Sequence, residues 1–345
     1  MQPSTRALTA LAGALVLGPA LGWLANGSRP PPVLAADALV PTAKAAEPTA
    51  PPAAPPPAPA PAPPPTERAD AHLVRSWRAP LAGGLLLFPP SFASADGRYD
   101  LVIHLNGNTD LVEESYGYAG VNAVVMILNL GVGSGLYEDR FADPAAFRLI
   151  LARVRNVLTE RGLAHNRLRR VAVSAWSSGY GGVIKLLQHE EIFDRLDAVV
   201  LFDAIHCGYE PVNHRLKPDQ IEPIRRFARR AVEGRALLSI THSEIATYGY
   251  LDAHKTTDAV LDVLGLHRTP TARAQPMPVL RSMVGVMPKA MMVPLTPLTE
   301  VHRGGLHVRG YDGNGPITHM LHLVQMSTTA LPDLVARWKD EPEGK

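Results

Sequence analysis

Continuous apolar runs alternate with amphipathic stretches along most of the chain. The runs are rich in aliphatic and β-branched residues, which favours strands buried in a parallel sheet. They lie at 84–89, 99–105, 121–130, 169–175, 196–203, 236–242 and 305–311. Helical periodicity between them predicts helices at about 144–162, 183–187, 219–233 and 256–265, with a further helix at the C-terminus. This alternation predicts right-handed βαβ units and an α/β fold with a mainly parallel β-sheet flanked by helices.

The stretch 169–182 carries the clearest chemical signal. It opens with a β-branched run, passes through Ala175-Trp176-Ser177-Ser178-Gly179 and continues into an amphipathic helical run. A serine at a sharp strand-to-helix turn requires small residues two positions before and after it, and Ala175 and Gly179 meet that need. The alternative is an ordinary strand-turn-helix unit whose serines cap the helix.

This stretch resembles the nucleophile elbow of the α/β-hydrolase superfamily, whose usual pattern is Gly-x-Ser-x-Gly. The sequence departs from that pattern only in having Ala175 at the first glycine. The resemblance extends over about residues 80–340 as an order of elements and implies an α/β-hydrolase fold. It also implies the chain order nucleophile, acid, histidine, with Ser177 as nucleophile and His319 as base. His322, one helical turn further on, is the alternative base.

Several carboxylates compete for the role of the acid. Asp203 ends the strand that follows the elbow unit, so its side chain is expected at the ligand-binding edge of the sheet. Glu244 follows the next strand, which is the commoner place in the superfamily, and Asp252 lies a little further on. Asp312 is close to His319 in sequence and either orients it or serves the turn. Asp203 is the preferred acid, with Glu244 as the alternative.

The resemblance also assigns the remaining parts of the site. The loop after the strand 99–105 reads Asn106-Gly107-Asn108 where the superfamily usually has a His-Gly motif. This implies an oxyanion hole formed by the backbone N–H groups of Ser178 and Asn108, with Asn106 and Gly107 in the substrate cleft. Tyr137, after a glycine-rich loop, and Trp176 are further candidates for the cleft, although Trp176 also suits core packing. That glycine-rich loop lacks the spacing of a nucleotide-binding fingerprint.

The first 70 residues differ in character from the rest of the 345-residue chain. Residues 7–25 form an uncharged apolar run, which predicts a signal peptide or signal anchor over 1–35 and therefore an exported protein. Residues 36–70 are dominated by proline and alanine, and we expect a disordered linker that could tether the domain at a membrane. The hydrolase domain is predicted over 71–345, in the periplasm or outside the cell.

Composition limits the remaining choices. The net charge of +2 gives no reason to expect nucleic acid as a partner, and Cys207 is the only cysteine, so no internal disulfide is expected. Cys207 lacks an elbow and is predicted to be a buried structural thiol. His104, His206 and His242 all end predicted strands, so a metal site is an alternative, but no helical His-x-x-x-His pair supports it.

These observations predict a serine hydrolase that cleaves a carboxylic ester, or less readily an amide, through an acyl-serine intermediate without a cofactor or metal. Its expected partner is a small-molecule or lipid ester. A non-catalytic binding module of the same fold at the cell surface, and a metal-dependent hydrolase, are the alternatives. The Met-rich stretch 275–297 is expected to pack onto the body of the domain, with a lid or an interfacial surface as alternatives.

Overall fold

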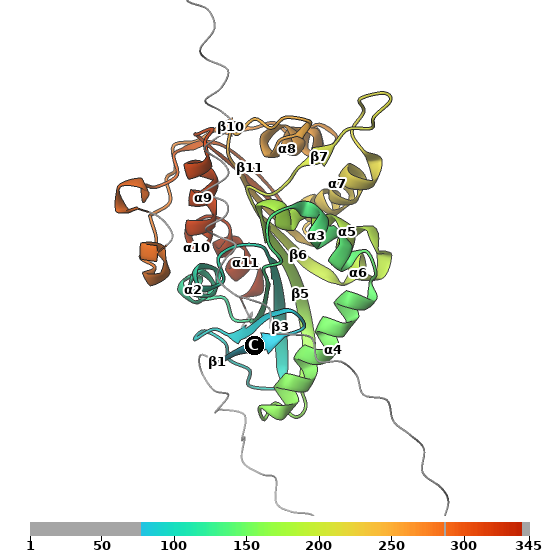
Figure 1. Ribbon diagram of the computed structural model, residues 1–345, viewed down its shortest axis with the longest axis vertical. Helices are drawn as coiled ribbons and strands as arrows, with labels where there is room; N and C mark the ends of the chain where they lie inside the picture. Colours follow the sequence, from blue (N-terminus) through green and yellow to red (C-terminus); the bar gives the residue numbers. More distant parts are fainter. Residues whose placement is uncertain (1–76, 286–287, 340–345) are drawn as a thin grey trace, which may run out of the picture.

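The computed structural model describes residues 77–285 and 288–339, and the predicted signal segment and linker lie outside these residues. Within the described part, one sheet of ten strands runs through the molecule (Figure 1). In spatial order its strands are β1 (Trp77–Leu81), β2 (Gly84–Phe88), β4 (Val124–Leu128), β3 (Arg98–Leu105), β5 (Arg167–Trp176), β6 (Leu196–Phe202), β8 (Leu237–His242), β12 (Leu306–Tyr311), β11 (Pro297–Arg303) and β10 (Thr269–Pro270).

The six strands from β4 to β12 in that order are parallel to one another, and the strands at both edges are antiparallel. A short second sheet pairs β7 (Cys207–Gly208) with β9 (Tyr250–Leu251). The central strands are apolar on both faces, as expected for parallel strands that are covered by helices on each side. The predicted α/β fold with a mainly parallel sheet flanked by helices is confirmed.

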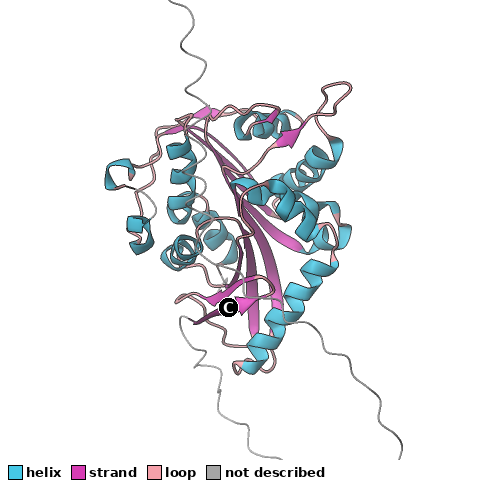
Figure 2. Ribbon diagram, viewed as in Figure 1, coloured by secondary structure: helices cyan, strands magenta, loops and turns pink. Residues whose placement is uncertain are grey.

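Helices cover both faces of the sheet (Figure 2). The core on one face is shared with α3 (Ser134–Phe141), α4 (Ala145–Glu160), α5 (Tyr180–Gln188), α6 (Glu190–Arg195), α7 (Pro218–Val232) and α8 (Ala253–Asp262). The core on the other face is shared with α2 (Thr109–Ala119), α9 (Pro316–Val324), α10 (Met326–Thr329) and α11 (Leu331–Trp338). Each central strand contributes alternate side chains to the two cores, which follows from the period of two along a strand.

Several elements were not predicted from the sequence, among them β1, α3, α6 and the short strands β7 and β9. The strands β10 and β11 form an antiparallel extension beside β12, and α2 follows β3. Strand β11 is only partly buried and includes Pro297 and Arg303, so it lacks the apolar run by which the central strands were recognised. Helix α2 has a short apolar face and contains Gly117, which lowers its intrinsic helix propensity.

The Met-rich stretch lies against the body of the domain, with Met283 buried and Met277 and Met292 packed against the core that contains α2 and α9. It is fastened by Glu114 of α2, which accepts hydrogen bonds from the backbone N–H groups of Arg281 and Ser282 and from the Ser282 hydroxyl. These hydrogen bonds lower the pKa of Glu114, although its partial burial opposes them. The segment is therefore docked rather than detached, as the sequence predicted.

In the described part of the chain, no helix combines the length and the apolar character that a bilayer crossing requires. Cys207 is buried, and burial raises the pKa of its thiol. Both observations concern described residues, which begin at Trp77. The signal segment and the linker in the first 70 residues therefore stay predictions.

Candidate active site

The turn after β5 holds Ser177 in the left-handed region, with a φ of 53°. Residues Ser177–Gly179 form the 3-10 turn η2, and α5 begins directly afterwards. Left-handed backbone is uncommon for a residue with a Cβ and is characteristic of functional turns. Gly179 makes the turn sterically feasible, because a Cβ at that position would lie 2.2 Å from the carbonyl oxygen of Leu105. The predicted strand, tight turn and helix around Ser177 are all present.

We expect Gly179→Ala to destabilise the protein, because the new methyl group collides with the backbone of β3 rather than with a flexible side chain. The expected loss in the free energy of unfolding is roughly 1–3 kcal/mol, measured by urea denaturation. Gly135→Ala is the matched control, since a Cβ at that helical position meets no atom within 4 Å. Equal stability of the two variants would contradict this account of the turn.

Three side chains from distant parts of the sequence meet at this turn. The Oγ of Ser177 lies 2.8 Å from Nε2 of His319, and Nδ1 of His319 lies 2.7 Å from Oδ2 of Asp203. An ionised carboxylate only accepts hydrogen bonds, so Nδ1 of His319 carries a proton and Nε2 of the neutral ring accepts from the Ser177 hydroxyl. This is the geometry in which a histidine can take a proton from a serine.

Asp203 directly follows β6, has a left-handed backbone (φ 45°) and is 6% exposed. Its Oδ1 accepts a hydrogen bond from the backbone N–H of Ser243 at 2.8 Å, and both carboxylate oxygens lie within 3.0 Å of the Ser243 hydroxyl. Burial alone would raise the pKa of Asp203. The adjacent His322 and His319 and the hydrogen bond from Ser243 outweigh burial, and they hold the pKa well below its usual range. Asp203 is therefore a fixed negative charge behind His319.

The alternative acid and base occupy other positions. Glu244 pairs with His254, with 2.6 Å between its Oε1 and Nδ1 of the histidine. Asp252 caps α8 by accepting from the backbone N–H of Lys255, and Asp312 is exposed. His322 is buried, with its Nδ1 2.9 Å from the hydroxyl of Thr241. Within the described chain, the structure therefore joins Ser177 and His319 to Asp203 and to none of the other candidates.

The loop between β3 and α2 is tied directly to the elbow. Asn106 adopts a φ of 70°, and its side-chain amide donates to the carbonyl of Trp176 and to the hydroxyl of Ser178. Its backbone N–H donates to Leu128, so both its main chain and its side chain are held. Gly107, with a φ of 131°, leads to Asn108 at the N-cap of α2. The loop that carries Asn108 is thus fixed against the turn that carries Ser178.

His104 supports this loop from the core. Its Nε2 lies 2.8 Å from the carbonyl oxygen of Asn106, so that nitrogen carries the proton. Burial lowers the pKa of His104 to about 3, and the neutral ring then accepts from the Ser174 hydroxyl through Nδ1 at 2.7 Å. Ser174 in turn accepts from the hydroxyl of Tyr116 at 2.5 Å. His104 is therefore a buried support for Asn106 in the loop predicted to carry an oxyanion-hole donor.

Two residues predicted as candidates for the cleft are buried instead. Tyr137 is fully buried, and its hydroxyl donates to the carbonyl of Gly131 and accepts from the N–H of Leu130, so it holds the glycine-rich loop in place. Trp176 is 3% exposed and stacks on the ring of His319, which agrees with the core packing that the sequence also suggested for it. Both side chains are buried for the same reason, because a large aromatic ring gains most from removing its apolar surface from water.

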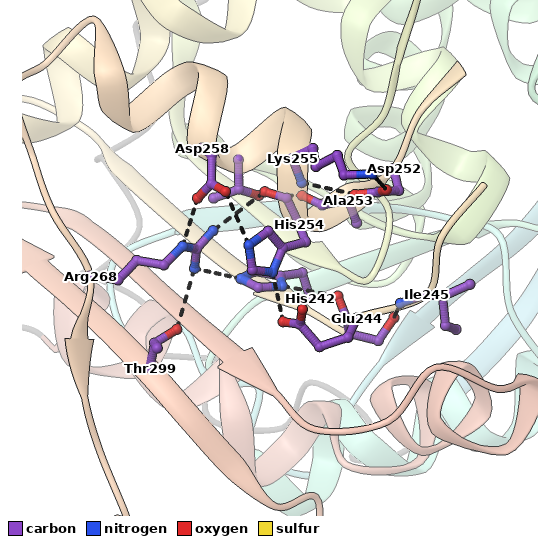
Figure 3. A network of polar contacts seen from close by, with 12 residues as sticks. His242, Glu244, Ile245, Asp252, Ala253, His254, Lys255, Asp258, Arg268 and Thr299 are labelled. Atoms are coloured by element: carbon purple, nitrogen blue, oxygen red, sulfur yellow. Dashed lines mark hydrogen bonds and ion pairs between the residues drawn. The ribbon is translucent and has the colours of Figure 1, made fainter. Parts of the chain in front are cut away.

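The three strand-end histidines do not converge on one point. His104 is bound to Ser174 and Asn106, and His206 lies near Ser134 and the carbonyl of Ala204. His242 belongs to a separate cluster that contains Glu244 and His254, shown in Figure 3.

The donor atoms of His242, Glu244 and His254 lie within 4.8 Å of one another, and two histidines with a glutamate suit zinc. However, Arg268 lies 2.6 Å from Nε2 of His242, and His254 already contacts the carboxylates of Glu244 and Asp258 (Figure 3). The guanidinium of Arg268 supplies the positive charge that a metal ion would bring. We therefore assign no metal to this cluster.

Sequence reasoning did not identify Ser243, Ser174 or Tyr116. Ser243 directly follows β8, so its position at the same edge of the sheet as Asp203 was a signal that could have been used. Ser174 contacts His104 and Tyr116 across 70 and 58 residues of sequence, and no local pattern connects them.

No family model matches the sequence, and no curated protein matches it either. Among solved structures, the chain is similar to a serine-to-alanine mutant of the feruloyl esterase module from Clostridium thermocellum complexed with sinapinate. The TM-score is 0.41, with 10% sequence identity, and the match covers 80% of this chain and 95% of that chain. At this similarity the match identifies neither a family nor a substrate.

Proposed function

We propose that this protein is a serine hydrolase of the α/β-hydrolase superfamily that cleaves a carboxylic ester through an acyl-serine intermediate. The observation that carries the proposal is the continuous chain of contacts from Ser177 through His319 to Asp203. It is supported by the left-handed backbone at Ser177 and by the burial of Asp203. A serine hydroxyl needs an adjacent, oriented base to act as a nucleophile, and these contacts meet that need.

In the proposed reaction, the Oγ of Ser177 attacks the ester carbonyl carbon while Nε2 of His319 takes the hydroxyl proton. Asp203 stabilises the imidazolium, and the backbone N–H groups of Ser178 and Asn108 bind the oxyanion. The C–O bond of the ester breaks as His319 returns its proton to the departing alcohol. Water then attacks the acyl group, gives a proton to His319, and releases the acid as Ser177 regains its proton.

The proposed site needs no metal or cofactor, because the nucleophile, base and acid are all side chains of this chain. We also propose that the domain acts outside the cytoplasm, in the periplasm or at the cell surface, with residues 7–25 as its export signal or anchor. The proposed substrate is a small-molecule or lipid ester.

The test is labelling of the purified protein with a fluorophosphonate probe, followed by mass spectrometry of the modified peptide. We expect stoichiometric labelling at Ser177, loss of labelling in Ser177→Ala, and labelling that is insensitive to EDTA. Ser94→Ala is the matched control, because it removes a serine hydroxyl that has no hydrogen-bond partner among the described residues and leaves the proposed site intact. A folded wild-type protein that does not react would favour a binding module, and labelling that a chelator abolishes would favour a metal-dependent enzyme.

A further inference from the structure

The indole of Trp176 lies against the proposed catalytic base. Its ring centroid is 4.7 Å from that of His319, and the two planes are inclined by 30°, so the rings are stacked. The indole Nε1–H also donates to the backbone carbonyl of His319 at 3.0 Å. Trp176 immediately precedes Ser177, and a single residue therefore joins the elbow to both the ring and the main chain of His319.

From this geometry we infer that Trp176 is a positioning residue that also favours the charged form of His319 during the reaction. This inference rests on the proposed function, because the charge on His319 matters only if that ring takes the proton of Ser177. The face of an indole carries negative electrostatic potential, and a cation held over it is stabilised. His319 becomes an imidazolium each time it accepts a proton, so the stacked indole stabilises the charge as it develops.

Other groups also act on the charge of His319. Asp203 is hydrogen-bonded to Nδ1 and favours the imidazolium, whereas His322 on the next turn of α9 opposes it only if His322 is itself charged. Burial lowers the pKa of His322 to about 4, so this ring is neutral near neutral pH. The charge of Asp203 and the face of Trp176 therefore act on His319 in the same direction.

The indole also keeps water from one face of His319, and this exclusion by itself disfavours a charged ring. The aromatic face of Trp176 favours the charged form of His319, whereas the exclusion of water disfavours it. Substitution of Trp176 can separate these two effects. In Trp176→Leu an apolar side chain still covers the imidazole, but the aromatic face and the N–H donor are both absent. Trp176→Phe also lacks the donor but retains a weaker aromatic face. Because both variants lack the N–H donor, the difference between them reports the contribution of the aromatic stacking.

The experiment measures the second-order rate of fluorophosphonate labelling of the full chain as a function of pH. This rate rises as His319 loses its proton and becomes able to accept the proton of Ser177. We expect Trp176→Leu to move the rising limb of the curve of labelling rate against pH to lower pH by roughly 0.5–1 unit. We also expect it to lower the plateau rate. Trp176→Phe should move the limb less. Both variants must retain a cooperative thermal unfolding transition.

Trp338 provides a matched control. It is also buried and donates its indole N–H, in this case to Asp197 on the strand β6, but it does not contact His319. Trp338→Phe should therefore leave the limb in place. A limb that is unchanged in Trp176→Leu, or displaced to higher pH, would overturn the inference while leaving Ser177 as the nucleophile. Absence of labelling in the folded wild-type protein would instead defeat the proposed function.

Discussion

Asp203→Asn is expected to lower kcat/KM for a chromogenic ester such as p-nitrophenyl butyrate by about 10⁴-fold, the scale known for the same change in serine-protease triads. The backbone N–H of Ser243 donates to Oδ1 of Asp203, so the amide oxygen of asparagine will occupy that position. The amide NH₂ then faces Nδ1 of His319 and donates to it. That contact forces the proton onto Nε2, which can no longer accept the proton of Ser177.

Glu244→Gln is the matched control for this prediction, because Glu244 is the competing acid in the sequence. Its carboxylate contacts His254 and not His319, so we expect kcat/KM to stay within a few-fold of the wild-type value. Thermal unfolding of both variants separates loss of activity from loss of folded protein. A larger loss of activity in Glu244→Gln than in Asp203→Asn would move the acid to the end of β8 and refute the proposed triad.

The second large effect is an early loss of stability in acid. His104, His242 and His322 are fully buried, and burial lowers their pKa values to about 3, about 3 and about 4. In the unfolded chain each histidine titrates near pH 6.5. Near pH 5 the unfolded state therefore binds about three more protons than the native state at these positions. The free energy of unfolding must fall as the pH is lowered toward this value.

Each of these histidines contributes a slope of about 1.4 kcal/mol per pH unit, so the three together contribute roughly 4 kcal/mol per unit below pH 6. Urea denaturation at pH 8, 6 and 5 will measure the slope. Asp203 acts in a separate pH window. Its lowered pKa stabilises the folded protein, and this stabilisation is lost only as the pH falls below the usual pKa range of an aspartate. His322→Gln should reduce the measured slope by about 1.4 kcal/mol per pH unit. A stability that stays constant from pH 7.5 to 5 would show that these rings are not neutral and buried.

Local patterns were sufficient for most of the fold. The central parallel strands are continuous apolar runs, and helices such as α4 and α7 have a clear apolar face, so burial on both sides of a sheet is visible in the sequence itself. The antiparallel strands β10 and β11 lack this signal because they lie at an edge and are partly exposed. The elbow could be located for the same local reason, since a strained turn needs small residues at fixed offsets from Ser177.

The sequence by itself determined where a nucleophile and a base could lie, because Ser177 and His319 occupy recognisable places in the order of elements. Only the tertiary structure decided which carboxylate reaches His319, since Asp203, Glu244 and Asp312 all follow strands and differ only in where their side chains point. It also decided that Trp176 packs on His319 and that His104 supports Asn106. These contacts join residues brought together by the lateral order of strands, which no local pattern specifies.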